Sequence, residues 1–271
     1  MPRHRVHLFV IVAAVAGPAS TATAQTAPAE PTKFEGALGL VTNYGPEYAG
    51  AASNGLRLVP AGFLRYGRWT LSGSGGFTTR SHTDVERGLA ASLVERNRLR
   101  LGLSLRLDSG RRESSSDRLA GIGSVERTVR GRLQMRWRPD DDWTLSTGLS
   151  VDLLGRHGGW WADAGVSREW RLAAETRLQV GASLSMAGDT YFQRWYGVTP
   201  EQSQRSGFPV YTPGEGLHDV NLGATLRTEF GPRWSGFVST GLSRQLGPAA
   251  ASPLTERATG WSVGSGLAWR F

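Results

Sequence analysis

The sequence of 271 residues contains no cysteine and only one lysine, Lys33. Because there is no cysteine, the chain has neither disulfides nor cysteine-ligated zinc, and its stability must have another source. After residue 24, no apolar run is long enough to cross a bilayer as a helix. Mean hydropathy is slightly negative, yet the chain holds 10 tryptophans and 36 glycines, a combination that is rare in soluble proteins with so few helix signals.

The N-terminus has the three parts of a secretory signal. A basic segment, Met1–Arg5, precedes the apolar run Val6–Ala16, and Ala22–Ala24 supplies the small residues that signal peptidase requires. The alternative is an uncleaved anchor, for which the apolar run is too short. The sequence therefore predicts a signal peptide over residues 1–24, followed by a disordered periplasmic tail over residues 25–33.

The predicted mature chain is basic through arginine. Removing residues 1–24 removes Arg3 and Arg5, which leaves 31 − 2 = 29 basic and 23 acidic side chains, a net charge of +6. An exported protein rarely meets nucleic acid, so nucleic acid is not expected as a partner. Lipopolysaccharide, anionic solutes and internal pairing with carboxylates are the better partners for these guanidinium groups.

The last twelve residues, Gly260–Phe271, alternate with a period of two. Apolar or small residues from Trp261 to Trp269 and Phe271 occupy one face, and small or polar residues occupy the other. A final strand with a terminal aromatic residue is typical of an outer-membrane barrel, whose lipid face ends in an aromatic girdle. The alternative for this strand alone is an edge strand of a soluble β-sandwich.

Alternating segments continue through the rest of the chain. We expect strands at Phe34–Asn43, Leu56–Tyr66, Trp69–Thr79, Val85–Glu95, Arg98–Asp108, Val125–Arg138, Trp143–Leu153, Trp160–Arg171, Thr176–Met186, Leu217–Phe230, Trp234–Arg244 and Arg257–Phe271. Tight connections such as Gly67-Arg68 and Arg96-Asn97 alternate with long ones, although Gly155–Gly159 is shorter than this rule predicts. Short periplasmic turns and long extracellular loops are typical of outer-membrane barrels.

These patterns together predict the fold class. We expect an all-β protein, in which residues 34–271 form a transmembrane antiparallel up-and-down β-barrel of about twelve strands, with ten as the alternative. The expected location is the cell outer membrane of a Gram-negative type of cell, in contact with lipid and lipopolysaccharide. Phe271 is expected to act as the signal by which the barrel assembly machinery recognises the chain.

Three loop motifs stand between the expected strands. The longest covers Tyr191–Leu217, with an aromatic-Tyr-Gly-Val core at Trp195–Val198 and the pair Ser206-Gly207. The other two are Tyr44–Gly50 and Ala251–Leu254. Together they resemble the MipA/OmpV family of outer-membrane proteins, which are related to the MltA-interacting protein, although Trp195 departs from the tyrosine that family members often carry. The resemblance implies a barrel that scaffolds murein-remodelling enzymes or contributes to envelope integrity.

The longest motif also has a physical interpretation. Thr199 can cap a short helix that has Pro200 in its first turn and Gln202 at its third position. The motif holds too many aromatic residues to leave in water, so it should fold onto or into the barrel mouth. It is either a packed lid or a binding platform, and the candidate binding residues are Tyr191, Trp195, Tyr196, Gly197, Val198, Ser206 and Gly207.

Charged side chains alternate onto the expected inner face of the barrel. The main candidates are Arg98, Arg100, Arg106, Arg130, Arg132, Asp152 and Glu229. Opposite charges can pair across the interior and support it, or they can leave a basic path that selects anions. We favour pairing, because a barrel interior is expected to be polar in any case.

The sequence offers little for catalysis. The mature chain has three histidines, His82, His157 and His218. His218 and Asp219 are neighbours and should point to opposite faces of a strand, which argues against a catalytic pair. We find no nucleophile elbow and no zinc spacing, so we expect no enzyme activity, no metal and no cofactor.

Two hypotheses for function follow. The first is a scaffold that associates with a murein hydrolase or synthase complex, although the tight periplasmic turns leave little docking surface beyond residues 25–33 and Asp140–Asp142. The second is a passive or gated channel for small anionic solutes. The sequence does not choose between them.

Overall fold

The computed structural model describes residues 34–73 and 87–271. The predicted signal peptide and tail over residues 1–33 lie outside the described residues. So do residues 74–86, which include His82, the end of the predicted strand Trp69–Thr79 and the start of Val85–Glu95. The strands and helices discussed below all belong to the unit Lys33–Phe271.

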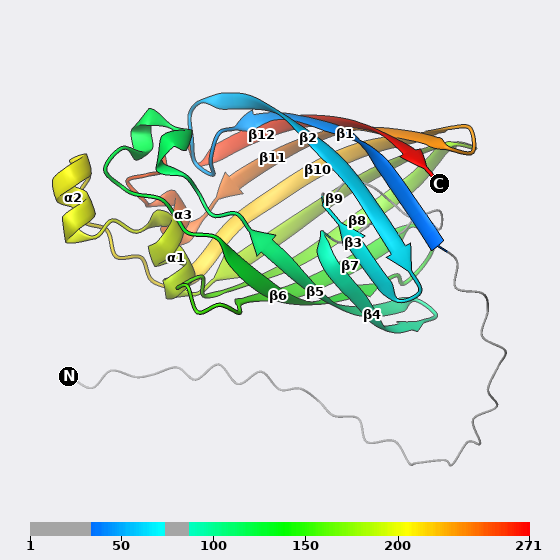
Figure 1. Cartoon of the computed structure of the whole chain (residues 1–271), viewed down its shortest axis with the longest axis horizontal. Coiled ribbons are helices and arrows are strands. Elements are labelled where there is room, and N and C mark those ends of the chain that lie inside the picture. The colour runs from blue at the N-terminus through cyan, green and yellow to red at the C-terminus, as the bar shows by residue number, and fades with distance from the viewer. Residues whose placement is uncertain (1–33, 74–86) are drawn as a thin grey trace, which may run out of the picture. The chain divides into compact units, whose positions relative to one another are not determined.

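The described chain forms one closed antiparallel barrel (Figure 1). Its strands are β1 (Phe34–Pro46), β2 (Asn54–Tyr66), β3 (Trp69–Ser72), β4 (Gly88–Arg96), β5 (Leu99–Asp108), β6 (Thr128–Trp137), β7 (Trp143–Asp152), β8 (Trp160–Ala173), β9 (Thr176–Ala187), β10 (Gly216–Phe230), β11 (Trp234–Gln245) and β12 (Thr259–Arg270). Each strand pairs with its neighbours in sequence, and β1 pairs with β12 to close the ring. The prediction of an up-and-down barrel with twelve strands is confirmed.

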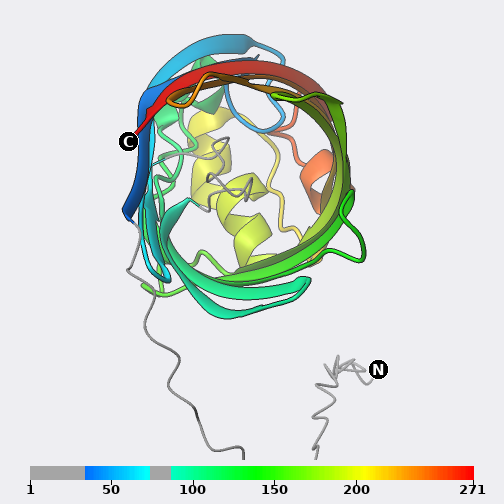
Figure 2. The ribbon, with the colours of Figure 1, turned by 90° about the vertical axis from the view of Figure 1, so that its right-hand side faces the viewer.

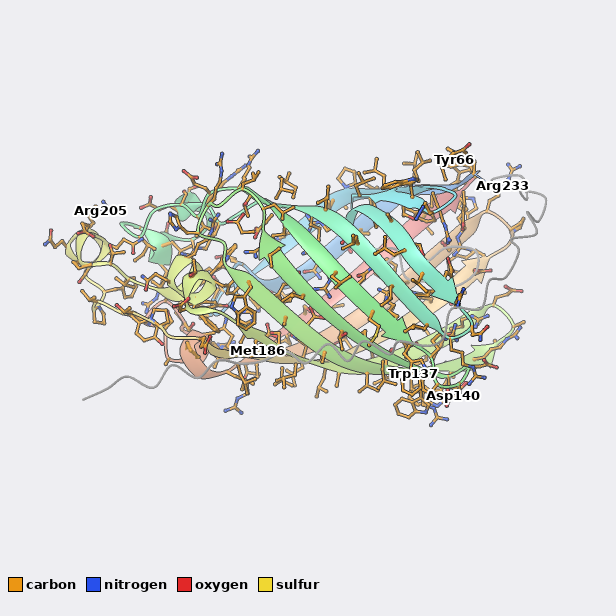
Figure 3. All side chains as sticks on the ribbon, turned by 90° about the horizontal axis from the view of Figure 1, so that it is seen from below. Tyr66, Trp137, Asp140, Met186, Arg205 and Arg233 are labelled. Atoms are coloured by element: carbon orange, nitrogen blue, oxygen red, sulfur yellow. The ribbon has the colours of Figure 1, made fainter. Side chains whose placement is uncertain are left out.

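Alternation along each strand separates two environments. In β5, Leu105 and Leu107 on the outer face are 47% and 60% exposed, whereas Ser104 on the inner face of the same strand is 3% exposed. Large apolar side chains stand on the outer surface of the barrel along its length (Figure 3). Such a surface fits contact with lipid, because exposing so large an apolar area to water would be unfavourable. In the described residues no helix has the length and apolarity needed to span a bilayer.

The two ends of the barrel differ. Short turns, together with Phe34 and Phe271, lie at one end, and the longer described connections with the helices of the described residues lie at the other (Figure 1). We call the second end the mouth. Gly67 (φ 57°) and Gly231 (φ 79°) occupy two of the short turns, where the left-handed backbone favours glycine. The helical elements at the mouth are η1 (Glu113–Ser115), η2 (Asp117–Leu119), α1 (Asp189–Tyr196), α2 (Pro200–Ser206) and α3 (Gly247–Ala250).

The barrel closes where β1 meets β12. Their register runs from Ala37 opposite Arg270 to Tyr44 opposite Val263. On the inner side, Ala37, Ala61, Phe63 and Ala268 form a buried apolar cluster. This part of the wall is therefore apolar, in contrast to the charged wall that β5–β8 provide.

Candidate functional site: the closed mouth and the charged lumen

Helix α1 lies inside the mouth of the barrel (Figure 2). Phe192 is fully buried and Tyr196 is 4% exposed, and both pack against Ala187 of β9 and Ala249 of α3. Burial raises the pKa of Tyr191 and Tyr196 well above the usual tyrosine value, so both phenols stay neutral. We call residues 188–215, which carry α1 and α2, the mouth lid.

Tyr196 joins the lid to the barrel wall. Its hydroxyl lies 3.0 Å from Nε2 of His218 on β10 and accepts a hydrogen bond of 3.2 Å from Gln245 at the end of β11. The hydroxyl of Ser252 donates to the carbonyl oxygen of Tyr196 at 2.7 Å. The hydroxyl groups, imidazole and amide in this cluster are buried, so each bond is protected from water.

The expectation that His218 and Asp219 point to opposite faces is wrong. The pairing of β10 with β9 shifts register between Leu217 and Asp219, and this bulge turns both side chains inward. Nδ1 of His218 lies 2.8 Å from Asp219 and 3.1 Å from the hydroxyl of Ser185. Ser185 and Asp219 both lie at Nδ1 of His218, so Ser185, His218 and Asp219 do not have the relay geometry of a catalytic triad. Nε2 of His218 faces the buried hydroxyl of Tyr196.

Helix α2 begins as the sequence predicts. The Thr199 hydroxyl accepts from the backbone N–H of Gln202 at 3.2 Å, and the Gln202 side chain accepts from the Thr199 N–H at 2.8 Å. Pro200 occupies the first turn, and Gly207 (φ 77°) ends the helix in a left-handed conformation. The predicted capping at Thr199 is therefore confirmed.

We expect Thr199→Ala to destabilise α2 by about 1 kcal/mol, because the Thr199 hydroxyl accepts from the Gln202 N–H and donates to the Glu201 carboxylate, and both bonds are lost. Amide hydrogen exchange in residues 200–206 should become faster, while the strands keep their protection. Thr199→Asn, which can still cap, is the matched control and should leave exchange nearly unchanged. Equal exchange in the alanine variant and the native chain would show that the cap is not limiting.

The three loop motifs of the sequence meet at the mouth. The Tyr48 hydroxyl donates to the carbonyl oxygen of Leu254 at 3.2 Å and to the carboxylate of Glu256 at 3.1 Å. Burial, and then the hydrogen bond to Glu256, raise the pKa of Tyr48 to about 12. Leu254 in turn packs with Ile122 and with Val198 of the lid. Links far apart in sequence thus form one buried layer over the barrel.

The seven candidate residues of the lid occupy different environments. Tyr191 packs under Arg130, whose guanidinium carbon lies 5.3 Å from the ring centre, and Val198 is fully buried. Ser206 bonds back to its own helix through the Gln202 carbonyl, and Gly207 is its cap. Trp195 and Gly197 line cavities beside the lid. Most of these residues therefore build the lid, and few present free surface.

Ion pairs join side chains on the inner wall of the barrel. We call the interior that this wall encloses the lumen. Arg130 bonds to Asp108 at 2.8 Å, and Arg132 bonds to both oxygens of Asp163 at 2.6 and 2.9 Å. Gly148 allows the second pair, because a side chain on β7 at this position would collide with the Arg132 guanidinium that crosses to β8. Further pairs join Arg177 to Glu169, Arg270 to Glu229 and Arg100 to Glu95.

Two lumen candidates are placed differently from the simple expectation, whereas Arg106 is placed as expected. Arg98 lies in the turn between β4 and β5 and donates to the carbonyl of Pro139, so it belongs to the rim at the short-turn end. Asp152 accepts from Thr128 and from the backbone N–H of Gly158, so it orders the link after β7 and pairs with no arginine side chain of the described residues. Arg106 faces inward next to Asp108 on β5.

Sequence reasoning missed α1 and Arg111. Helix α1 shows no strong cap, because Gly188 at its start makes no side-chain bond. Arg111 comes from a link without periodicity, and the structure half-buries it beside Trp195. The tight cluster of aromatic residues in the lid was the one signal of this burial.

Comparisons with known proteins give one family and several barrels. A family model described as MltA-interacting protein MipA matches residues 38–271. Among solved structures, the chain is similar to the NanC porin (8% identity, 86% of this chain and 98% of that chain, TM-score 0.45). It is also similar to an outer membrane channel from Pseudomonas putida F1 (9%, 92% and 100%, 0.43) and to the KdgM porin (10%, 86% and 98%, 0.37). A search of curated proteins found no match.

Proposed function

The chain belongs to the MltA-interacting protein MipA family, and we propose that this outer-membrane barrel is a gated channel for small solutes. In this proposal the mouth lid is the gate, and α1 closes the end of the barrel that faces the cell exterior. The family match and the apolar outer surface support the location in the outer membrane. We further propose that residues 1–24 are removed after Ala24, which N-terminal sequencing of the mature protein would test.

The main support for a channel is the small size of the side chains that point into the middle of the barrel. Alternation places Gly165, Gly181, Ser183, Gly223, Thr225, Ser239, Gly241 and Gly264 on the inner face of β8–β12. Gly223, as well as Asn43 on β1, is exposed although it faces inward. The interior below the lid therefore retains space for solvent, which a barrel filled only for support would not need.

Arginines at the short-turn end favour anions as solutes. A cavity of about 170 Å³ there is lined by Arg98, Arg100, Arg136, Arg138 and Arg227 as well as by Asp140–Asp142 and Glu169. Because guanidinium groups bind carboxylates and phosphates strongly, such a rim attracts anions while the acidic residues limit how tightly they are held. Release from the rim then stays fast enough for conduction.

The test is conductance of the purified mature chain in a planar bilayer. We expect discrete conductance steps with anion preference, and a shift toward cations by severalfold in Arg132→Ser, which leaves Asp163 without its partner midway along the lumen. The double variant Arg132→Ser/Asp163→Asn should return the ion preference toward the native ratio. Arg171→Ser, a change of equal charge at the short-turn end of β8, where Arg171 bonds to the Ala174 carbonyl, should have little effect.

A folded, inserted barrel that never conducts, including after removal of the lid contacts, would overturn the channel proposal. An ion preference that Arg132→Ser leaves unchanged would overturn the assignment of this pair to the conducting path. Reversal-potential measurements in asymmetric salt separate these two results.

A scaffold is the second candidate, because the matching family is described as interacting with MltA. The exposed turn Asp140–Asp142 is the acidic surface that could hold a murein hydrolase or synthase complex at the short-turn end. Replacing all three aspartates by asparagine should then abolish co-purification of the complex from solubilised membranes at low salt. Membranes that yield no murein enzyme with the native chain would argue strongly against this candidate.

A further inference from the structure

A cavity of about 640 Å³ opens at the mouth beside α1. It lies between the lid, the link between β5 and β6, and the link between β7 and β8. Its lining includes three arginines, Arg111, Arg156 and Arg194, and we call it the arginine cavity. Its volume is in the range of small-molecule sites, which are roughly 300–1,000 Å³.

Arg111 is the unusual member of this lining. Its side chain is half-buried, and partial burial lowers the pKa of its guanidinium. Among residues 34–73 and 87–271, no carboxylate lies within ion-pair distance of Arg111. One guanidinium nitrogen donates to the carbonyl of Trp195 at 2.9 Å, and Nε has no partner in the described part of the chain. A half-buried cation whose Nε is shielded from solvent and has no counter-ion is costly, so an anion that enters the cavity would be favoured there.

The other two arginines are engaged only weakly. Arg156 lies 3.2 Å from Glu126, but both side chains are largely exposed, and such surface pairs contribute little. Arg194 donates to the backbone carbonyl of Glu126, and its Nε is buried without a partner among the described residues. Both arginines can therefore turn to a stronger acceptor without breaking a buried ion pair.

The acidic members of the lining do not cancel this charge. Oδ1 of Asp189 accepts from both the backbone N–H and the hydroxyl of Thr190 in the first turn of α1, so part of this charge is compensated by the helix. Glu126 is mostly exposed beside Arg156. Hydroxyl and amide groups complete the surface, from Ser124, Gln193 and Thr212. Cations and neutral hydrogen-bonding groups together suit an oxyanion attached to a polyol.

We propose that the arginine cavity binds a small solute that carries a carboxylate or a phosphate together with hydroxyl groups. Arg111 binds the oxyanion from below, Arg156 and Arg194 approach it from the sides, and the hydroxyl and amide groups hold the rest of the solute. Arg111 also lines a second cavity of about 290 Å³ together with Trp195 and Tyr196, so the oxyanion sits at a residue that both cavities share. The site stands whether or not the barrel conducts.

The test uses the purified full mature chain in detergent with three probes: glucose 6-phosphate, gluconate and glucose. Titration calorimetry should show binding of at least one acid and no comparable binding of glucose. The ratio of the affinities for the two acids then shows whether the site prefers a phosphate or a carboxylate. Binding should weaken as salt rises. We expect Arg111→Met to weaken the affinity for the acid about tenfold or more, since the change removes a charge-assisted contact.

The matched control is Arg127→Met, which makes the same change at an exposed position of the same link outside the cavity. It should bind the acids as the native chain does. If Arg111→Met does not fold into a heat-modifiable barrel, Arg156→Gln/Arg194→Gln replaces it and should lose binding equally. The proposal is overturned if neither acid binds at millimolar concentration, if glucose binds as tightly, or if the folded variants bind unchanged.

Discussion

Phe271→Ser is expected to lower the amount of folded protein in the outer membrane severalfold and to leave unfolded chain to periplasmic proteases. Signal cleavage should be unaffected, because residues 1–24 are unchanged. The measurement is the heat-modifiable fraction in isolated outer membranes, compared at equal expression. The expected effect is large because the same residue is expected to be recognised by the barrel assembly machinery and to help close the barrel between β12 and β1.

The structure gives the closure part of this argument. The backbone N–H of Phe271 donates to the carbonyl of Gly36 on β1 at 3.0 Å, beyond the last strand residue. Its ring lies 5.4 Å from Trp269 and 6.1 Å from Phe34, and it covers Gly36, where a Cβ would meet the ring at 2.5 Å. Loss of this burial accounts for about 1.5–3 kcal/mol, which is small for a closed ladder. A severalfold assembly defect would therefore point to recognition by the assembly machinery.

Phe230→Ser is the matched control for this experiment. Phe230 ends β10 at the same end of the barrel and is 58% exposed on the outer surface, so its loss removes a comparable aromatic side chain without touching the terminus. Wild-type amounts of embedded Phe271→Ser protein would refute the terminal signal and leave the barrel itself unaffected. Equal defects in both variants would assign the effect to the aromatic belt.

The barrel could be predicted because its strands obey a local rule. Each residue of β5 or β12 faces either lipid or lumen, and this choice is readable from alternation without knowledge of partners. Pairing of sequence neighbours then follows from the short turns, and only the ring closure between β1 and β12 is non-local. Every expected strand with described bounds lies within a few residues of its prediction.

The site could be predicted only in part, because it depends on departures from that rule. The bulge beside Leu217 turns His218 and Asp219 to the same side, and no residue type in this stretch signals an extra residue. Partial burial of Arg111 depends on how three links fold over one another, which alternation does not describe. The cap at Thr199 was predictable, because the capping box is again a local rule.

Phe192→Ala is expected to release the lid and to raise the open probability of the channel a hundredfold or more; this expectation rests on the proposed function. Phe192 is fully buried between Ala187, Ala249 and the ring of His218, at 5.8 Å between ring centres. Truncating a buried phenylalanine costs about 3–5 kcal/mol. The cost falls on α1, because the barrel ladder has no bond to this side chain, and 1.4 kcal/mol corresponds to a tenfold change in population.

Two measurements make this prediction decisive. Hydrogen exchange should become faster in α1 but not in β9 or β10, and single-channel recordings should show long open periods in place of brief ones. Val210→Ala, at a 53% exposed position of the same lid, is the matched control and should change neither. Because faster exchange reports release of α1 directly, faster exchange without a change in conductance would show that the helix is not the gate. Unchanged exchange would show instead that Tyr196, through His218 and Gln245, holds the lid by itself.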